Sequence, residues 1–157
     1  MPPRAQTAHP VRHQEELLEV FRIRHQVFVE EQSVPLEEEG DEHDAQAFHV
    51  LGRLLDGQAV ATGRLVIRGT SGKLGRIAVS KSWRGQGWGR SVMHALMDEA
   101  ARRGLRELLL DSQVHAIPFY EGLGFAVQGP VFLECGIPHR RMTRLLERVP
   151  SVRKDPQ

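Results

Sequence analysis

Residues 77–90 read Ile77-Ala78-Val79-Ser80-Lys81-Ser82-Trp83-Arg84-Gly85-Gln86-Gly87-Trp88-Gly89-Arg90. The apolar beginning predicts a strand, and three glycines within five positions predict a loop that leads directly into a helix. Glycines let the backbone approach a ligand closely, and the free N–H groups at a helix N-terminus attract anions. Arg84 and Arg90 flank the loop with guanidinium groups that suit phosphate oxygens. The segment therefore predicts a turn that binds a diphosphate.

Two other phosphate-binding patterns match this turn poorly. The P-loop pattern Gly-x-x-x-x-Gly-Lys-Ser/Thr is absent from the sequence. The dinucleotide fingerprint Gly-x-Gly-x-x-Gly differs in spacing from Gly85-x-Gly87-x-Gly89, and hairpins precede the turn where that fold has a βαβ unit. Asp111, however, ends the next predicted strand and imitates the ribose-binding acid of the dinucleotide fold. A small Rossmann-type NAD(P)-dependent oxidoreductase therefore stays as an alternative.

Upstream of the turn, the sequence predicts one helix and a set of hairpins. A helix is expected over 15–24, because residues with helical spacing fall on one side of it: Leu17, Phe21, Arg24 and Phe28. An acidic loop follows at 37–44, and Asp56-Gly57 is a strong signal for a tight hairpin turn. The strands are expected around Val11 and over 47–56, 58–68 and 74–79.

Downstream of the turn, the pattern changes to a strand–helix–strand crossover and a last hairpin. A helix is expected over 88–103, with Gly104 as its terminator. The other elements are expected at 105–111 (strand), 116–121 (short helix), 125–134 (strand) and 139–146 (strand). This order predicts an α/β (α+β) fold with one mixed, mostly antiparallel sheet and helices on both of its faces.

Length and charge limit the class of protein. The 157 residues fit a single domain over 1–157, with mobile tails at about 1–8 and 149–157. The net charge is +1, so we expect neither a nucleic acid nor a membrane surface as partner. The sequence has no run long enough to span a membrane and no secretory signal, so we expect a cytoplasmic protein. The single Cys135 and the spacing of the eight histidines predict no metal site.

The motif Arg84-x-x-Gly87-x-Gly89 resembles the Gln/Arg-x-x-Gly-x-Gly/Ala motif of the GNAT superfamily of N-acetyltransferases. The order strand, motif, helix, strand is also similar, as is the later box Phe119-Tyr120-Glu121-Gly122-Leu123-Gly124-Phe125. The resemblance extends over about residues 15–146 and implies the acyl-CoA N-acyltransferase fold. Two further segments resemble the ElaA-like branch of the family: Val27-Phe28-Val29-Glu30-Glu31-Gln32 and Glu134-Cys135-Gly136-Ile137-Pro138-His139.

The resemblance implies acetyl-CoA as the acyl donor, with no metal. The residues that would bind its diphosphate are those of the motif: Arg84, Gly85, Gln86, Gly87, Trp88, Gly89 and Arg90. The preceding strand would offer backbone groups to the pantetheine arm at Ile77, Ala78 and Val79, where it diverges from the strand at 105–111. Gln113 stands where the wider family often has an Asn that contacts the cofactor, and His115 lies beside it as a further candidate.

For the chemistry, the resemblance implies transfer of an acetyl group to a primary amine, directly in a ternary complex. Tyr120 would lie near the sulfur and protonate the departing thiolate, which contributes about 10²–10⁴ in rate. No motif fixes the base that deprotonates the amine. Glu31 is the first candidate; the other possible bases and acceptor contacts are Arg24, Asp41, Asp44, His49 and His139.

The acceptor is expected to be a small-molecule or peptide amine, and a homodimer is a further possibility. The fold itself does not choose among acceptors. The acidic loop at 37–44 is either a solvated loop or a wall that attracts a cationic amine. Besides the oxidoreductase, a binding module that senses acyl-CoA without turnover is the other alternative to the transferase.

Overall fold

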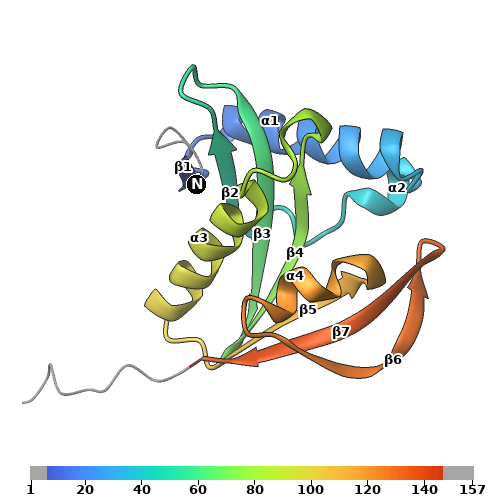
Figure 1. Ribbon diagram of the computed structural model, residues 1–157. Helices are drawn as coiled ribbons and strands as arrows, with labels where there is room; N and C mark the ends of the chain where they lie inside the picture. Colours follow the sequence, from blue (N-terminus) through green and yellow to red (C-terminus); the bar gives the residue numbers. More distant parts are fainter. Residues whose placement is uncertain (1–6, 147–157) are drawn as a thin grey trace, which may run out of the picture.

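In the computed structural model, which describes residues 7–146, one seven-stranded sheet has the order β1-β2-β3-β4-β5-β7-β6 (Figure 1). Of these neighbouring pairs, only β4 and β5 run parallel. The expected mixed, mostly antiparallel sheet is therefore confirmed. The strands are β1 (Thr7–Pro10), β2 (Phe48–Arg53), β3 (Ala59–Arg68), β4 (Ser71–Val79), β5 (Glu107–Gln113), β6 (Ala126–Glu134) and β7 (Ile137–Leu145).

Helices cover both faces of this sheet. α1 buries Val20 beside Leu51 of β2 on one face, and α3 buries Leu96 beside Val50 of β2 on the other. Val50 and Leu51 reach opposite faces because successive side chains of a strand alternate. The helical segments are α1 (Gln14–Arg24), the π-helix η1 (His25–Glu31), α2 (Leu36–Glu39), the 3₁₀ turns η2 (Lys81–Trp83) and η3 (Val114–Ala116), α3 (Trp88–Arg102) and α4 (Ile117–Glu121).

β4 and β5 pair only near their beginnings. Their last paired residues are Lys73 and Leu109, after which β4 continues to Val79 and β5 continues to Gln113 beside β7. Figure 1 shows the two strands diverging from this point. Arg76 of β4 has a φ of 54°, and the β3–β4 register shifts nearby, as in a β-bulge. The expected divergence is therefore observed, and its backbone groups need other partners.

The predicted ends of two segments need correction. Thr7 and Ala8, which the sequence places in a tail at about 1–8, belong to β1, and residues 1–6 lie outside the described part of the chain. The tail expected at 149–157 lies outside the described residues. The helix expected over 15–24 continues without a break as η1, a widened helix that the sequence pattern does not signal.

The buried side of α1 is also offset from the predicted side. Its buried residues are Val20, Ile23 and Arg24, whereas Phe21 is 37% exposed. An arginine lies on the buried side because carboxylates of the acidic loop neutralise it, as described below. Arg24 lies on both the predicted and the observed side, and Val20 and Ile23 are the buried residues that the prediction left out.

Candidate active site

The glycine turn lies between β4 and α3. Gly85 and Gly87 have φ values of 76° and 92°, in the left-handed region that glycine adopts without steric cost. Gly87 is the N-cap of α3, and the Ser91 amide donates to its carbonyl at 3.0 Å. The amides that precede Ser91 in the first turn have no acceptor within the helix. The turn therefore presents main-chain donors and the positive end of a helix dipole at one point.

Trp88 contributes its main chain to the turn, and its indole packs in the core. Its side chain is 2% exposed, and a Cβ at Gly52 would lie only 2.8 Å from its Cε3. Gly52 of β2 therefore makes room for the indole. The indole Nε1 is buried and has no hydrogen-bond partner within residues 7–146. This packing fixes the start of α3 against the sheet.

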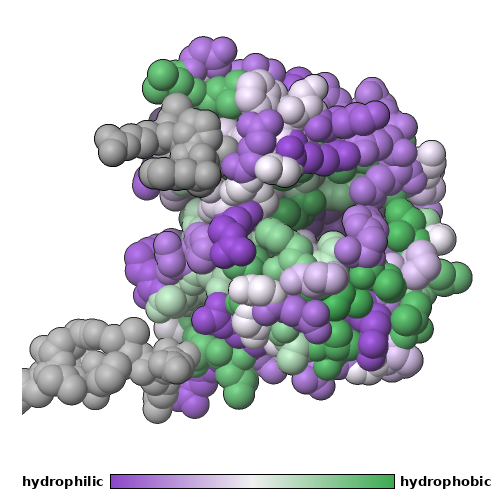
Figure 2. All heavy atoms as spheres, in the orientation of Figure 1, coloured by the Kyte–Doolittle hydropathy of each residue, from purple (hydrophilic) through white to green (hydrophobic). Residues whose placement is uncertain are grey.

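α4 lies beside the turn and carries Tyr120. A Cβ at Gly89 would lie 3.4 Å from Phe119, so the first turn of α3 faces α4 closely. The Tyr120 ring packs edge-to-face on Phe119 and Phe125, with centroids 4.9 and 6.3 Å away. Burial raises the pKa of Tyr120 to about 12. Within residues 7–146 its hydroxyl has no hydrogen-bond partner. Figure 2, in the orientation of Figure 1, shows that the molecular surface is hollowed on the side facing the viewer, with hydrophobic residues on the floor of the hollow.

Arg84, the first residue of the motif, is held by two groups. Its Nη atoms donate to both carboxylate oxygens of Glu31 at 2.5 and 2.6 Å, and its Nε donates to the Val79 carbonyl at 2.9 Å. Arg84 lowers the pKa of the Glu31 carboxyl by hydrogen bonding and by its charge. A carboxylate held in this way is a weak base. Arg90, at the other end of the motif, is exposed.

Gln113 lies at the end of β5 in a short chain of hydrogen bonds. Its Nε2 donates to Gln32 Oε1 at 2.9 Å, and His115 Nε2 lies 2.8 Å from its Oε1. The structure thus brings Gln113 and His115 together, on the β5 side of the divergence. The motif lies on the β4 side, so the expected cofactor residues surround the opening between the two strands.

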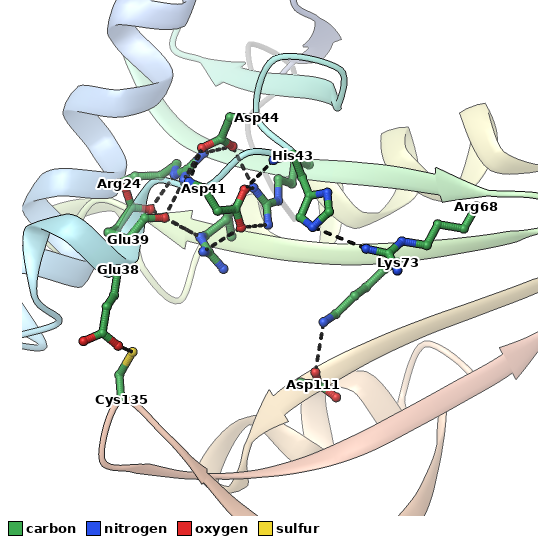
Figure 3. Close-up of polar contacts among 12 residues, drawn as sticks. Arg24, Glu38, Glu39, Asp41, His43, Asp44, Arg68, Lys73, Asp111 and Cys135 are labelled. Carbon is green, nitrogen blue, oxygen red and sulfur yellow. Dashed lines mark hydrogen bonds and ion pairs between the residues drawn. The ribbon is translucent and has the colours of Figure 1, made fainter.

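The acidic loop is paired with buried arginines (Figure 3). Arg24 has a fully buried side chain, and it donates to Glu39 at 2.6 Å and to Asp44 at 2.7 Å. Arg64 of β3 donates to Asp41 and to Asp44, both at 2.7 Å. Charges taken out of water in this way require such partners. Arg24, expected as an acceptor contact, is enclosed in this cluster.

Arg76 completes the cluster from β4. It donates to the Glu39 carbonyl at 3.0 Å and to Asp41 at 3.2 Å. Hydrogen bonds from Arg64 hold the pKa of Asp41 well below its usual range. Burial alone would raise the pKa of Asp44, but hydrogen bonds from Arg24 and Arg64 lower it. Since Glu39, Asp41 and Asp44 are paired with arginines, this part of the acidic loop is neither the solvated loop nor the wall for cationic amines that the sequence suggested.

The two histidine candidates are enclosed. His49 is 5% exposed, its Nε2 lies 2.9 Å from the Asp44 carbonyl, and burial lowers its pKa. With Asp44 it lines an open depression of about 300 Å³ beside the start of α1. His139 is 7% exposed, with Nδ1 2.6 Å from the Ile137 carbonyl, and it stacks on Phe132. Because a carbonyl only accepts, each of these ring nitrogens is a donor.

Comparisons with known proteins agree with this geometry. The sequence profile of the acetyltransferase (GNAT) domain matches residues 9–146. The chain belongs to the GNAT acetyltransferase family. It is 40% identical to the uncharacterized N-acetyltransferase YjcF of Bacillus subtilis over 135 residues, which cover 85% of this chain and 95% of YjcF.

Two solved structures share the fold of this GNAT domain. An acyl-CoA N-acyltransferase of Pseudomonas aeruginosa has a TM-score of 0.77 and 31% identity, covering 88% of this chain and 97% of that one. ElaA of Escherichia coli has a TM-score of 0.77 and 26% identity, covering 92% and 99%. The expected fold and the similarity to ElaA are thereby confirmed. A sheet of this topology also excludes the Rossmann alternative, which needs a parallel doubly wound sheet.

Asp111, the residue that suggested that alternative, has other partners in this GNAT domain. Arg141 of β7 donates to it at 2.5 Å. The Lys73 ammonium lies 3.2 Å from it, as Figure 3 shows. Within the described residues, no helix is long and apolar enough to cross a membrane. No group of three metal-ligating side chains is found in that same part of the chain, and the absence of a metal stays a prediction.

Sequence reasoning missed Gln32 and the arginines of β3 and β4. Gln32 contacts Gln113, which is 81 positions away, and Arg64 contacts Asp41 across 23 positions. Contacts over such separations leave no local pattern. One signal was available for Arg64, because it interrupts the mostly apolar run 59–67. A charge at such a position calls for an opposite charge nearby.

Proposed function

We propose that this GNAT protein transfers an acetyl group from acetyl-CoA to a primary amine. One observation carries the proposal: β4 and β5 diverge directly beside a glycine turn that caps α3. Such an opening suits an extended arm with amide groups, and the turn suits a diphosphate. Gly85 and Gly87 have no side chains, so a diphosphate can approach the main-chain amides of the turn.

The residues of the turn and of β4 would hold the donor as the resemblance implies. Main-chain amides of Arg84 to Arg90 would bind the diphosphate, and backbone groups of Ile77 to Val79 would bind the pantetheine amides. The thioester supplies an activated acetyl group. During transfer the amine nitrogen bonds to the carbonyl carbon, the carbon–sulfur bond breaks, the sulfur gains a proton and the nitrogen loses one. Positioning both reactants in one ternary complex supplies much of the acceleration.

We propose that the Tyr120 hydroxyl lies beside the thioester sulfur of the donor. A pKa of about 12 keeps this hydroxyl protonated at neutral pH, so the hydroxyl can donate a hydrogen bond. Its acidity is well below that of a thiol, whose pKa is about 8.5. We therefore infer that Tyr120 stabilises the developing thiolate by a hydrogen bond, with a rate contribution near the lower end of about 10²–10⁴.

For the amine proton, we propose transfer to water in the open divergence. The carboxylate candidates Glu31, Asp41 and Asp44 are all ion-paired. Each has a lowered pKa, which weakens it as a base. The enclosed His49 and His139 each use one ring N–H to donate a hydrogen bond to a carbonyl. Glu31 as the base stays a prediction, and the Glu31→Gln variant described below distinguishes a base from a positioning residue.

We also propose that the acceptor is a small-molecule or peptide amine, with neither nucleic acid nor membrane as partner. A cytoplasmic location and a homodimer complete the proposed description.

Release of free thiol tests the transferase against an acyl-CoA sensor. The purified protein is incubated with acetyl-CoA and a panel of primary amines, and a thiol reagent reports coenzyme A. We expect at least one amine to accelerate thiol release well above hydrolysis without amine. If the protein binds acetyl-CoA and no amine in a broad panel accelerates release, the sensor is the better account.

A further inference from the structure

Two consecutive residues at the end of η1 contact opposite sides of the β4–β5 divergence. Glu31 binds Arg84, in the turn that follows β4. Gln32 binds Gln113, the last residue of β5. Adjacent side chains at a helix end point in different directions, so one short segment can reach both strands. We name Glu31 and Gln32 the clasp.

The Glu31 side of the clasp fixes the turn. Both Glu31 oxygens accept from Arg84 at 2.5 and 2.6 Å, a bidentate geometry that restricts the guanidinium in angle as well as distance. Arg84 Nε donates at the same time to the Val79 carbonyl at 2.9 Å. Arg84 therefore ties η1, the end of β4 and the start of the glycine turn together.

The Gln32 side of the clasp fixes the end of β5. Gln32 accepts from Gln113 at 2.9 Å, and Gln113 in turn contacts His115 at 2.8 Å. These two contacts order the segment that leads from β5 through η3 into α4, which carries Tyr120. The clasp thus connects the diphosphate turn to the segment that leads to Tyr120.

The backbone of the clasp supports a specific role. η1 is a π-helix, a form that is rare and often found at functional sites. The Gln32 amide donates to the Val27 carbonyl, and Ser33, directly after it, has a left-handed φ of 61°. A non-glycine residue in that region is uncommon and persists where its surroundings require it.

We propose that Glu31 and Gln32 are positioning residues that set the opening between β4 and β5 for the acyl-CoA donor. The proposal rests on the proposed function, since it assigns the clasp to the donor site. It differs from the base role expected for Glu31. The lowered pKa of Glu31 agrees with a structural ion pair and not with a base poised near neutral pH.

The test compares Glu31→Gln with Glu30→Gln. Glu30 is the neighbouring carboxylate of η1, pairs with His25 at 3.2 Å and is 62% exposed, which makes it a matched control. Calorimetry measures the Kd of coenzyme A, and steady-state kinetics separate KM from kcat. Hydrogen exchange measures protection of residues 80–84, where the Ser80 and Trp83 amides donate to main-chain carbonyls. Gln32→Ala tests the other side of the clasp.

Positioning predicts a three- to tenfold weaker Kd for coenzyme A in Glu31→Gln, with a matching rise in KM for acetyl-CoA. It also predicts faster exchange in 80–84 and a kcat at saturation within about threefold of wild type. Gln32→Ala should weaken Kd similarly, and Glu30→Gln should leave all these values unchanged. A kcat loss above tenfold in Glu31→Gln, with unchanged Kd and exchange, would assign Glu31 as the base and overturn the proposal.

Failure of the proposed function gives a different result. A wild-type protein that does not bind coenzyme A contradicts the donor site itself. Hydrogen exchange then still decides whether the clasp orders the turn, because it needs no ligand. Unchanged exchange in 80–84 of Glu31→Gln overturns the clasp in either case.

Discussion

Tyr120 packs with its ring in the interior, and its hydroxyl is the group proposed to contact the thiolate. Its ring is part of an aromatic cluster with Phe119 and Phe125, while its hydroxyl has no hydrogen-bond partner within residues 7–146. Tyr120→Phe keeps the ring and removes only the hydroxyl. We expect kcat to fall about 10²-fold while the Kd of coenzyme A stays within twofold, measured by thiol release and calorimetry. A large loss of affinity at unchanged melting temperature would show that Tyr120 binds the donor instead.

Gly87 is the residue on which the diphosphate site depends most. Its φ of 92° suits glycine, and a glutamate there adds bulk, strain and negative charge at the anion site. Gly87→Glu should weaken coenzyme A binding at least 100-fold in calorimetry. Gly104, with a φ of 75° and open space around its Cβ position, is the control, since Gly104→Glu carries similar strain at the other end of α3. Equal Kd values for the two variants would refute the assignment of the turn.

At the scale of elements, the buried ion pairs attach the acidic loop and α2 to the sheet. The pKa values of Asp41 and Asp44 are lowered in the folded state by Arg64 and Arg24. Their contribution to stability is therefore present above the unfolded pKa of about 3.9 and is lost as pH falls through the folded values.

Urea unfolding between pH 7 and pH 3 measures this contribution. We expect the free energy of unfolding to decrease first below about pH 6.5, because burial lowers the pKa of His49 and the unfolded chain binds that proton more readily. Below about pH 5 we expect a further decrease of about 1–3 kcal/mol toward pH 3 from the carboxylates, since partial exposure of Asp41 screens its pair. Arg64→Met should lower stability at pH 7 and flatten the acid dependence. A wild-type curve without any decrease below pH 5 would contradict the role of the ion pairs.

Most elements could be predicted from the sequence because their signals are local. The strands around Asp56-Gly57, the glycine turn and the helix that ends near Gly104 depend on turn residues and periodicity within a few positions. The continuation of α1 as η1 and the short α2 could not be predicted in this way. Their geometry depends on Arg24 and Glu31, whose partners come from distant segments.

At the scale of the whole molecule, the site is assembled from both halves of the chain. The motif residues predicted the turn, and Gln113 and His115 indeed lie across the opening from it. The carboxylate and histidine candidates depend on residue type alone, and the structure encloses or pairs most of them. No local pattern identifies the acceptor, since one fold serves many substrates.

We propose that the turn at 84–90 and the β4–β5 opening bind coenzyme A by its diphosphate and its arm. Calorimetric titration of the wild-type protein with coenzyme A, pantetheine and NAD tests this binding. We expect a Kd in the micromolar range for coenzyme A, at least 100-fold weaker binding of pantetheine, which lacks the diphosphate, and no measurable binding of NAD. Equal affinity for pantetheine and coenzyme A, or preference for NAD, would contradict it.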